Sequence, residues 1–239
     1  MDDKAKQNLR GYYTKLKLND TELTFKLLRD DLTTQNTNVI VNAANNKLLF
    51  GDGIAGAIYK KAGPPINDEC KQIMKNRNNK NLDNGEVIPS SCGNMQNENL
   101  LYIFHAVGPY WFGGERSERF ELMLTFQSCL ALAEASEFSV ESISIPPIST
   151  GLFGYPIDDC AKVFFEVLIQ MFQDKTENRS KVILKEIRIV IIDSKTFDPF
   201  KDQFDKFLIE VQSKFATFLS EYGWIEYGDK NSHILKKLN

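Results

Sequence analysis

The sequence has no long apolar run. No window approaches the roughly 18 consecutive apolar residues that a membrane-spanning helix requires. Residues Met1–Leu9 are charged and lack the apolar core of a signal peptide. We therefore expect an intracellular protein, of the cytoplasm or nucleus, with no membrane partner.

Cysteine and histidine are also scarce. Four cysteines and two histidines occur, without a CxxC pair, so we expect no bound metal and no required cofactor. His105 lies inside a run that predicts a strand, and we interpret it as a hydrogen-bonded structural residue rather than an acid–base catalyst. Cys92 and Cys160 have no histidine near them in sequence, which argues against a thiol nucleophile.

The chain has no excess of positive charge. Its 29 lysines and arginines face 32 acidic residues, for a formal net charge of -3, and no dense basic cluster occurs. A polyanion would need a local basic patch, so we do not expect nucleic acid as a general partner.

What is present is enough apolar sequence for one sizeable core, with 42% hydrophobic residues and 17 phenylalanines in 239 residues. Runs rich in apolar and β-branched residues alternate with helical patterns. The predicted strands are Tyr13–Leu18, Leu23–Leu28, Val39–Val41, Leu100–Val107, Ser142–Pro146 and Ile187–Ile192, and the predicted helices are Ala55–Lys61, Ile66–Lys75, Glu118–Ala135 and Asp158–Phe172. This alternation predicts an α/β fold of three layers, α/β/α, around a central mixed, mostly parallel sheet of about six or seven strands.

A last core helix is predicted to start at Asp198-Pro199, an N-cap residue followed by proline. The apolar stripe that follows it is typical of core packing. Helical periodicity is lost from Tyr222 onward. We expect a flexible N-terminal segment at 1–11, the main domain at 12–219, and a C-terminal tail at 220–239 that packs over the domain or stays mobile.

Two glycine-bearing loops, Gly51–Gly56 and Ser149–Tyr155, each follow a predicted buried strand and precede a helix. Backbone N–H groups at a helix N-terminus favour a phosphate, and glycine lets the backbone approach it closely. Neither loop matches GxxxxGK[ST], which disfavours a P-loop, and the second loop does not match GxGxxG. We infer that the two loops hold a diphosphate between them.

Several motifs occur together in an order and spacing that resemble the macrodomain family of ADP-ribose binders and hydrolases. The matching segments are Asp31-Leu32-Thr33, Val41-Asn-Ala-Ala-Asn45, Gly51–Gly56, Phe104-His-Ala-Val-Gly-Pro109, Ile145-Pro-Pro-Ile-Ser-Thr-Gly-Leu-Phe-Gly-Tyr155 and Glu186–Asp193. The resemblance covers about Tyr12 to Phe218. It looks closest to macrodomains joined to poly(ADP-ribose) polymerase-type transferases, and secondarily to viral ones. It implies a macrodomain-like fold with ADP-ribose as the ligand.

The resemblance implies roles for particular residues. Asp31 would accept a hydrogen bond from the adenine amine, with a turn cap as the alternative role, and Ile192 would help to wall the ring. Asn45 would contact the terminal ribose, whereas Asn42 would mainly fix the loop. Phe153 would pack on that ribose, or else simply plug the core. The full implied set is Asp31, Leu32, Asn42, Ala43, Asn45, Gly51, Gly53, Ile54, Ala55, Ser149, Thr150, Gly151, Leu152, Phe153, Gly154, Tyr155, Ile192 and Asp193.

The first loop departs from the family pattern in two places. Many hydrolytic macrodomains carry an aspartate where this chain has Ala55, which weakens the enzyme hypothesis. Asp52 stands within a stretch that is usually glycine. We interpret it as a substitution that tolerates a left-handed turn. The alternative is that Asp52 restores a carboxylate near the terminal ribose, at the cost of repelling the diphosphate.

The resemblance leads to a first hypothesis, a mono-ADP-ribosyl hydrolase that removes ester-linked ADP-ribose from acidic side chains. Its candidate catalytic residues are Asn45, Asp52, Gly151 and Phe153. The alternative is a non-catalytic reader of mono-ADP-ribosylated proteins, which Ala55 favours. A third is a scaffold whose tail, Tyr222–Asn239, binds a partner. The expected partners are ADP-ribosylated proteins and free ADP-ribose, with nucleic acid only as ADP-ribosylated ends, and the chain is expected to be a monomer.

Overall fold

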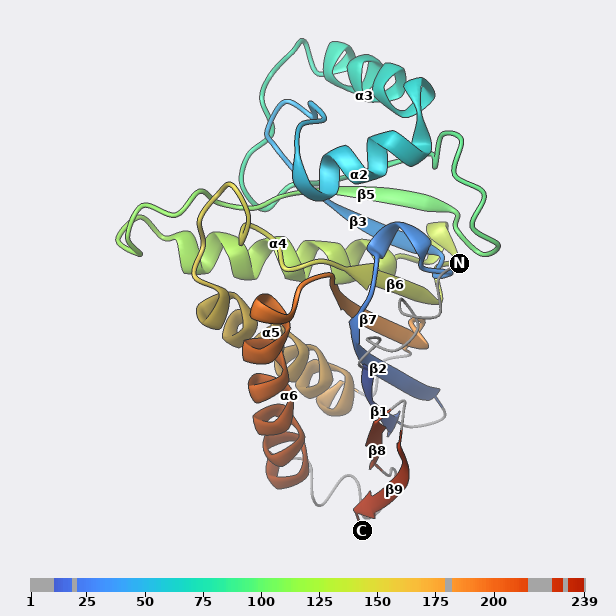
Figure 1. The fold of residues 1–239 in the computed structure, drawn as a ribbon, viewed down its shortest axis with the longest axis vertical. Helices are drawn as coiled ribbons and strands as arrows, with labels where there is room; N and C mark the ends of the chain where they lie inside the picture. The colour runs from blue at the N-terminus through green and yellow to red at the C-terminus, as the bar shows by residue number, and fades with distance from the viewer. Residues whose placement is uncertain (1–10, 19–20, 179–181, 215–224, 230–231, 239) are drawn as a thin grey trace.

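The structure, a computed structural model, describes residues 11–18, 21–178, 182–214, 225–229 and 232–238. Within these ranges nine strands form one sheet in the order β4-β5-β3-β6-β7-β2-β1-β8-β9 (Figure 1). The strands are β1 Gly11–Leu18, β2 Thr21–Arg29, β3 Val39–Ala44, β4 Val87–Ser90, β5 Tyr102–Val107, β6 Ser142–Ile145, β7 Glu186–Ile191, β8 Ile225–Asp229 and β9 Ser232–Leu238.

The five strands β5, β3, β6, β7 and β2 run parallel and form the centre of the sheet. The strands β4, β1, β8 and β9 pair antiparallel at its two sides. The predicted α/β class with a mixed sheet is confirmed, and β1 to β7 supply the expected number of strands. Strands β8 and β9 add to this sheet from within the segment predicted as a tail. The predicted boundary at 219/220 and nearly all of the segment 1–11 lie outside the described residues.

Helices cover both faces of the sheet, so the molecule has three layers (Figure 1). On one face lie α2 (Gly53–Ala62) and α3 (Pro64–Asn76), and on the other lie α4 (Glu118–Ala133), α5 (Ile157–Glu177) and α6 (Ser194–Lys214). Two short 3-10 helices, η1 (Leu32–Thr34) and η2 (Ser136–Phe138), complete the described elements.

Strand β3 shows how the sequence pattern separates the two layers. Val39 and Val41 belong to the core cluster shared with α4, α5 and α6, whereas Ile40 and Ala44 belong to the cluster shared with α2 and α3. Alternate side chains of a strand point to opposite faces, so a strand buried on both faces reads as a continuous apolar run. The end of β3 is therefore fixed between the two helical layers, where the first glycine-bearing loop begins.

Helix α6 begins at Ser194, so the predicted start at Asp198-Pro199 is wrong. Asp193 Oδ1 accepts a hydrogen bond from Thr196 N at 2.8 Å and caps the helix, while Pro199 lies inside it. The predicted apolar stripe does pack in the core, where Phe204 and Phe207 are buried. The earlier start carries the first turn of α6 to the carboxyl end of β7.

Candidate functional site

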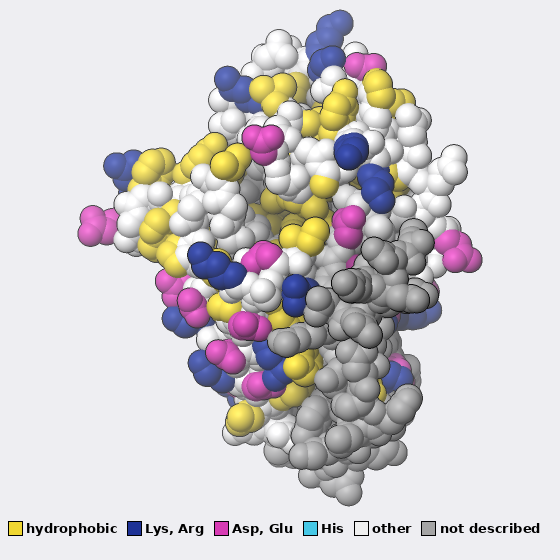
Figure 2. Space-filling view, viewed as in Figure 1, with side chains coloured by type: hydrophobic (Ala, Val, Ile, Leu, Met, Phe, Trp, Pro, Cys, Tyr) yellow, Lys and Arg dark blue, Asp and Glu magenta, His cyan; other side chains and the backbone are white. Residues whose placement is uncertain are grey.

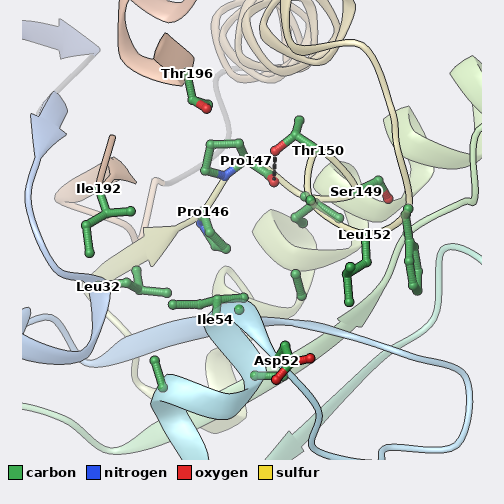
Figure 3. A pocket seen from close by; sticks show the side chains of 18 of the residues that line it. Leu32, Asp52, Ile54, Pro146, Pro147, Ser149, Thr150, Leu152, Ile192 and Thr196 are labelled. Carbon is green, nitrogen blue, oxygen red and sulfur yellow. Dashed lines mark hydrogen bonds between the residues drawn. The ribbon is translucent and has the colours of Figure 1, made fainter. Parts of the chain in front are cut away.

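A cavity of about 600 Å³ lies at the carboxyl ends of the parallel strands. Its walls come from the segment after β2, the end of β3 with the start of α2, the loop after β6, and the end of β7 with the start of α6. Figure 2 shows hydrophobic side chains inside the hollow, and Figure 3 shows side chains from these segments around it. This size is that of a site for a small organic ligand.

The cavity brings together most of the site residues that the resemblance in sequence implied. Those that line it are Asp31, Leu32, Ala43, Asn45, Gly51, Asp52, Gly53, Ile54, Ala55, Ser149, Thr150, Gly151, Leu152, Phe153, Ile192 and Asp193. Sequence reasoning did not select Asp30, Ala44, Leu49, Ala57, Gly108, Pro146, Pro147, Ile148, Val190, Ile191 and Thr196. Several of these residues are next to selected residues in the sequence or lie within the motifs quoted above. Those motifs could therefore have indicated them. Thr196 could be found only from the correct start of α6.

Three of the implied residues, Asn42, Gly154 and Tyr155, are not among those that line the cavity. Asn42 is buried, and its Nδ2 donates to His105 Nδ1 at 3.0 Å. Gly154 adopts a φ of 72° in the turn, and the buried Tyr155 donates its backbone N–H to Ser149 O at 3.0 Å. Their observed contacts support the loops from behind.

His105 is the centre of a buried network beneath the first loop. Its Nε2 lies 2.9 Å from Ser90 Oγ and 3.6 Å from Cys70 Sγ, and Phe50 of the loop presents its ring at 5.9 Å. Burial lowers the pKa of His105 to about 4, so the ring is neutral at physiological pH. These contacts agree with the structural role predicted for this residue.

Asn45 holds together the segment that leads from β3 into the first loop. Its Oδ1 accepts hydrogen bonds from Lys47 N at 3.1 Å and Leu49 N at 3.0 Å, and its Nδ2 donates to Leu49 O at 2.6 Å. An amide side chain offers two N–H donors and two oxygen lone pairs, so one N–H is left for a ligand. The structure thus gives Asn45 the loop-fixing role that the resemblance implied for Asn42.

Helix α2 opens onto the cavity at its N-terminus. The preceding Asp52 is exposed, has a φ of -82° and makes no side-chain cap. The idea that it tolerates a left-handed turn is wrong, because the left-handed residue is Gly53, with a φ of 65°. Ala55 lies buried in the first turn. The first backbone N–H groups of a helix have no intrahelical acceptor, and with the helix dipole they attract an anion.

The second loop is shaped by close contacts. Thr150 Oγ1 donates to Pro147 O at 2.9 Å (Figure 3). Ser149 has a φ of 67°, and its buried Oγ has no hydrogen-bond partner within the described chain. A Cβ on Gly108 would lie 2.3 Å from that Oγ, so glycine is required there for the loop to pack so tightly.

Phe153 of the second loop lines the cavity and is braced from the side. The Tyr110 ring stacks on it with 3.7 Å between ring centroids, and Trp111 N donates to Phe153 O at 2.8 Å. Phe153 is therefore packed against neighbouring side chains and also borders the cavity. The two predicted roles, filling the core and packing on the ribose, are compatible.

The opposite end of the cavity carries Asp31 and Ile192. Asp31 Oδ1 accepts hydrogen bonds from Thr33 N and Thr33 Oγ1, both at 2.8 Å, so the turn-cap role is real. Its Oδ2 forms no hydrogen bond within the described residues and is available to a ligand. Ile192 is 72% exposed and offers an aliphatic face on the same side of the cavity as Leu32, the residue after Asp31 (Figure 3).

Other kinds of site find little support in the described chain. It contains no group of three or more histidine, cysteine or acidic side chains that could hold a metal ion. Burial, with a smaller contribution from Glu69, raises the pKa of Cys92 to about 11, and burial raises that of Cys160 further. Neither thiol is ionised near neutral pH. Among the same residues, no helix has the length and apolar character needed to cross a bilayer.

Comparisons with known proteins agree with this geometry. The profile of the Macro domain family matches residues 41–164. A macro domain-containing protein of Caldanaerobacter subterraneus is 32% identical, over 76% of this chain and 95% of its own. One from Listeria monocytogenes is 36% identical, over 70% and 89%.

Solved structures are similar as well. The Oceanobacillus iheyensis macrodomain with ADP has a TM-score of 0.72 and 32% identity, covering 84% of this chain and 98% of that one. The Trypanosoma brucei macrodomain in complex with ADP-ribose has a TM-score of 0.60 and 25% identity, covering 74% and 68%. These relatives are bacterial and trypanosomal, so the narrower likeness to transferase-associated and viral macrodomains stays a prediction.

Proposed function

Because this chain belongs to the macrodomain family, we propose that it binds ADP-ribose and hydrolyses the ester between the terminal ribose and an acidic side chain of a modified protein. The proposal rests on one observation: both glycine-bearing loops and the N-terminus of α2 line the same cavity. The similar structures named above hold ADP and ADP-ribose, respectively.

Each part of the ligand has a chemical match in the cavity. The adenine lies between Leu32 and Ile192, and its amine donates to the free Oδ2 of Asp31. The diphosphate accepts from backbone N–H groups of the second loop and of the first turn of α2, which begins at Gly53. The terminal ribose lies against Phe153, within reach of the remaining amide N–H of Asn45.

Asp52 is the carboxylate best placed to assist hydrolysis. It lines the cavity on the side of Leu152, away from Ile192 (Figure 3). In this proposal it orients a water and accepts its proton as the water oxygen attacks the ester. The bond between the ribose carbon and the ester oxygen breaks, the acidic side chain leaves as a carboxylate, free ADP-ribose is released, and Asp52 returns its proton to solvent. Gly151 and Phe153 contribute by fixing the ribose, because proximity and orientation supply much of such an acceleration.

A release assay with an ester-linked mono-ADP-ribosylated protein tests the proposal. We expect the wild type to release ADP-ribose and Asp52→Ala to be slower by on the order of 100-fold, with ADP-ribose affinity nearly unchanged. Gly151→Glu serves as the cavity-blocked variant, because a Cβ at Gly151 meets nothing within 4 Å and the longer side chain can enter the cavity without disturbing the fold. It should neither bind nor release ADP-ribose. Unchanged turnover in Asp52→Ala would remove Asp52 from the mechanism.

The second candidate is a reader of mono-ADP-ribosylated proteins, which the alanine at position 55 favours. Ala55 is buried in the first turn of α2 and supplies no polar group where many hydrolytic macrodomains carry an aspartate. Tight ADP-ribose binding without release by the wild type would establish the reader.

A further inference from the structure

The loop between β5 and α4, residues 108–117, projects from the molecule (Figure 1), and its first residue, Gly108, lines the cavity. It exposes two aromatic side chains, with Tyr110 51% and Phe112 60% accessible. Figure 2 shows hydrophobic side chains and charged groups on this projection, next to the hollow. We call Tyr110, Phe112 and Arg116 the rim. Exposed aromatic groups gathered at the edge of a cavity are typical of an interaction surface.

The rim is continuous with the cavity. Tyr110 stacks on Phe153, which borders the cavity, and the Tyr110 and Phe112 rings follow with 6.5 Å between centroids. The Arg116 guanidinium lies 4.5 Å from the centroid of the Phe112 ring. A row of side chains therefore leads outward from the place proposed for the terminal ribose.

A buried carboxylate holds the rim in shape. Glu118 is 1% exposed and accepts backbone N–H bonds from Phe112 at 3.0 Å, from Gly114 at 3.1 Å and from Arg116. Burial acts to raise the pKa of Glu118, but backbone N–H groups, first its own and then those of Arg116, Phe112 and Gly114, lower it below its ordinary value. The backbone of both Phe112 and Arg116 is thus fixed by one group, and such preorganisation reduces the entropy lost on binding.

We propose that the rim docks the polypeptide that carries the ADP-ribose and recognises an acidic residue next to the modified side chain. The inference rests on the proposed function, in which the terminal ribose lies against Phe153. Because Tyr110 stacks on Phe153 and Phe112 follows it, a group attached to that ribose can reach both side chains. Within the described residues the Arg116 guanidinium lies over the Phe112 ring and has no acidic partner, so its charge is available to a carboxylate of the bound segment.

A polypeptide fits this surface better than a nucleic acid does. The rim carries one cation, with Glu115 adjacent to it in sequence, and the chain as a whole has a formal charge of -3. Binding along a nucleic-acid backbone depends on several cations that neutralise successive phosphates. Aromatic side chains and a single arginine are instead common anchors of peptide and protein recognition.

The test compares ligands with and without the polypeptide. The probes are free ADP-ribose and a hydrolysis-resistant ADP-ribosylated peptide with glutamate beside the modified residue, together with the same peptide carrying alanine there. The variants are Phe112→Ser and Arg116→Glu, matched by Ile209→Ser and Lys71→Glu, which alter exposed side chains on α6 and α3. Tyr110 is left intact because it contacts Phe153.

We expect both rim variants to lower affinity for the glutamate-flanked peptide by about 5- to 10-fold, the usual size of one anchor residue. Affinity for free ADP-ribose should not change, and the controls should behave as wild type. Arg116→Glu should have little effect on the alanine-flanked peptide. Thermal melting of each variant confirms that it is folded.

The rim proposal is overturned if the rim variants bind the peptide with the same affinity as the controls do. It is also overturned if their affinity for free ADP-ribose falls to the same degree as that for the peptide. An ADP-ribosylated oligonucleotide is titrated as a further probe, and the proposal is also overturned if the variants weaken binding of that probe alone. These results leave the proposed function intact, provided that the wild type binds free ADP-ribose. Failure of the wild type to bind it would reject the proposed function, and the rim with it.

Discussion

The two glycine-bearing loops are alike in sequence but are held in different ways. The first is held through the segment that leads into it, where Asn45 bonds the Leu49 backbone and the neutral His105 contacts Phe50. The second is fixed from the side by Tyr110 and Trp111 of the β5–α4 loop, whose backbone is bound in turn by the Glu118 carboxylate.

This difference teaches that one sequence pattern can rest on two kinds of support. The first loop depends on the core, so damage to it should reduce the stability of the whole domain. The second loop depends on a projecting surface segment, so changes there should alter ligand recognition more than stability.

Gly56→Ala should cost about 3 kcal/mol of unfolding free energy, the upper range for overpacking. A Cβ at Gly56 would lie 2.3 Å from the Gly51 carbonyl oxygen, so backbone must move. The matched variant Gly151→Ala in the second loop meets nothing within 4 Å and should change stability by less than about 0.5 kcal/mol. Urea unfolding measures the unfolding free energy of both variants. An equal loss of stability in the two would contradict the proposed difference between the loops.

Acidification should weaken the domain through His105. Its pKa is about 4 in the folded protein against 6.5 for the unperturbed group, so below pH 6.5 the unfolded chain takes up a proton that the folded chain does not. Stability is therefore lost as pH falls, by about 2 kcal/mol between pH 6.5 and 5. In His105→Gln this part of the slope should vanish. Parallel pH profiles of unfolding free energy in the two proteins would show that His105 is not responsible.

Asn45→Ala should lower the unfolding free energy by about 1 kcal/mol, through the lost loop hydrogen bonds. Because the loop as a whole loosens, we expect the affinity for ADP to fall by roughly 10-fold, and that for ADP-ribose to fall further, because the remaining amide N–H of Asn45 is proposed to reach the terminal ribose. Calorimetry with the two ligands separates these two effects, because ADP lacks the terminal ribose. Equal losses of affinity for the two ligands would contradict the direct contact.

Ser149→Gly should stabilise the domain slightly, by about 0.5 to 1 kcal/mol. Glycine relieves the positive φ of 67° and removes a buried hydroxyl that has no partner in the described chain. Ser149→Ala keeps the strained backbone and separates the two effects. A loss of stability in the glycine variant would indicate that the Ser149 hydroxyl supports the loop.

Much of the fold and the outline of the site could be predicted from the sequence, because burial on one or both faces leaves a periodic pattern. The parallel strands and the two glycine-bearing loops follow from that pattern. Details that depend on single hydrogen bonds could not be predicted in this way. Both Asp193 and Asp198 are able to cap a helix, and only the path of β7 decides between them.

The same limit applies to side chains that meet across the fold. Asn42 and Asn45 are equivalent in type, and their roles depend on whether His105 or the loop backbone is the nearer partner. Tyr110 and Phe153 are 43 residues apart, and their stacking follows from how two loops meet at one edge of the sheet. Local sequence carries no record of such pairs.

Calorimetric titration of ADP-ribose into the wild type and Gly151→Glu tests the central claim, that the cavity between the two loops is an ADP-ribose site. We predict saturable binding of one ligand by the wild type and at least about 100-fold weaker binding by the variant, a difference of about 2.7 kcal/mol, with the melting temperature unchanged. Equal affinity in the two proteins, or no binding by a folded wild type, would contradict it.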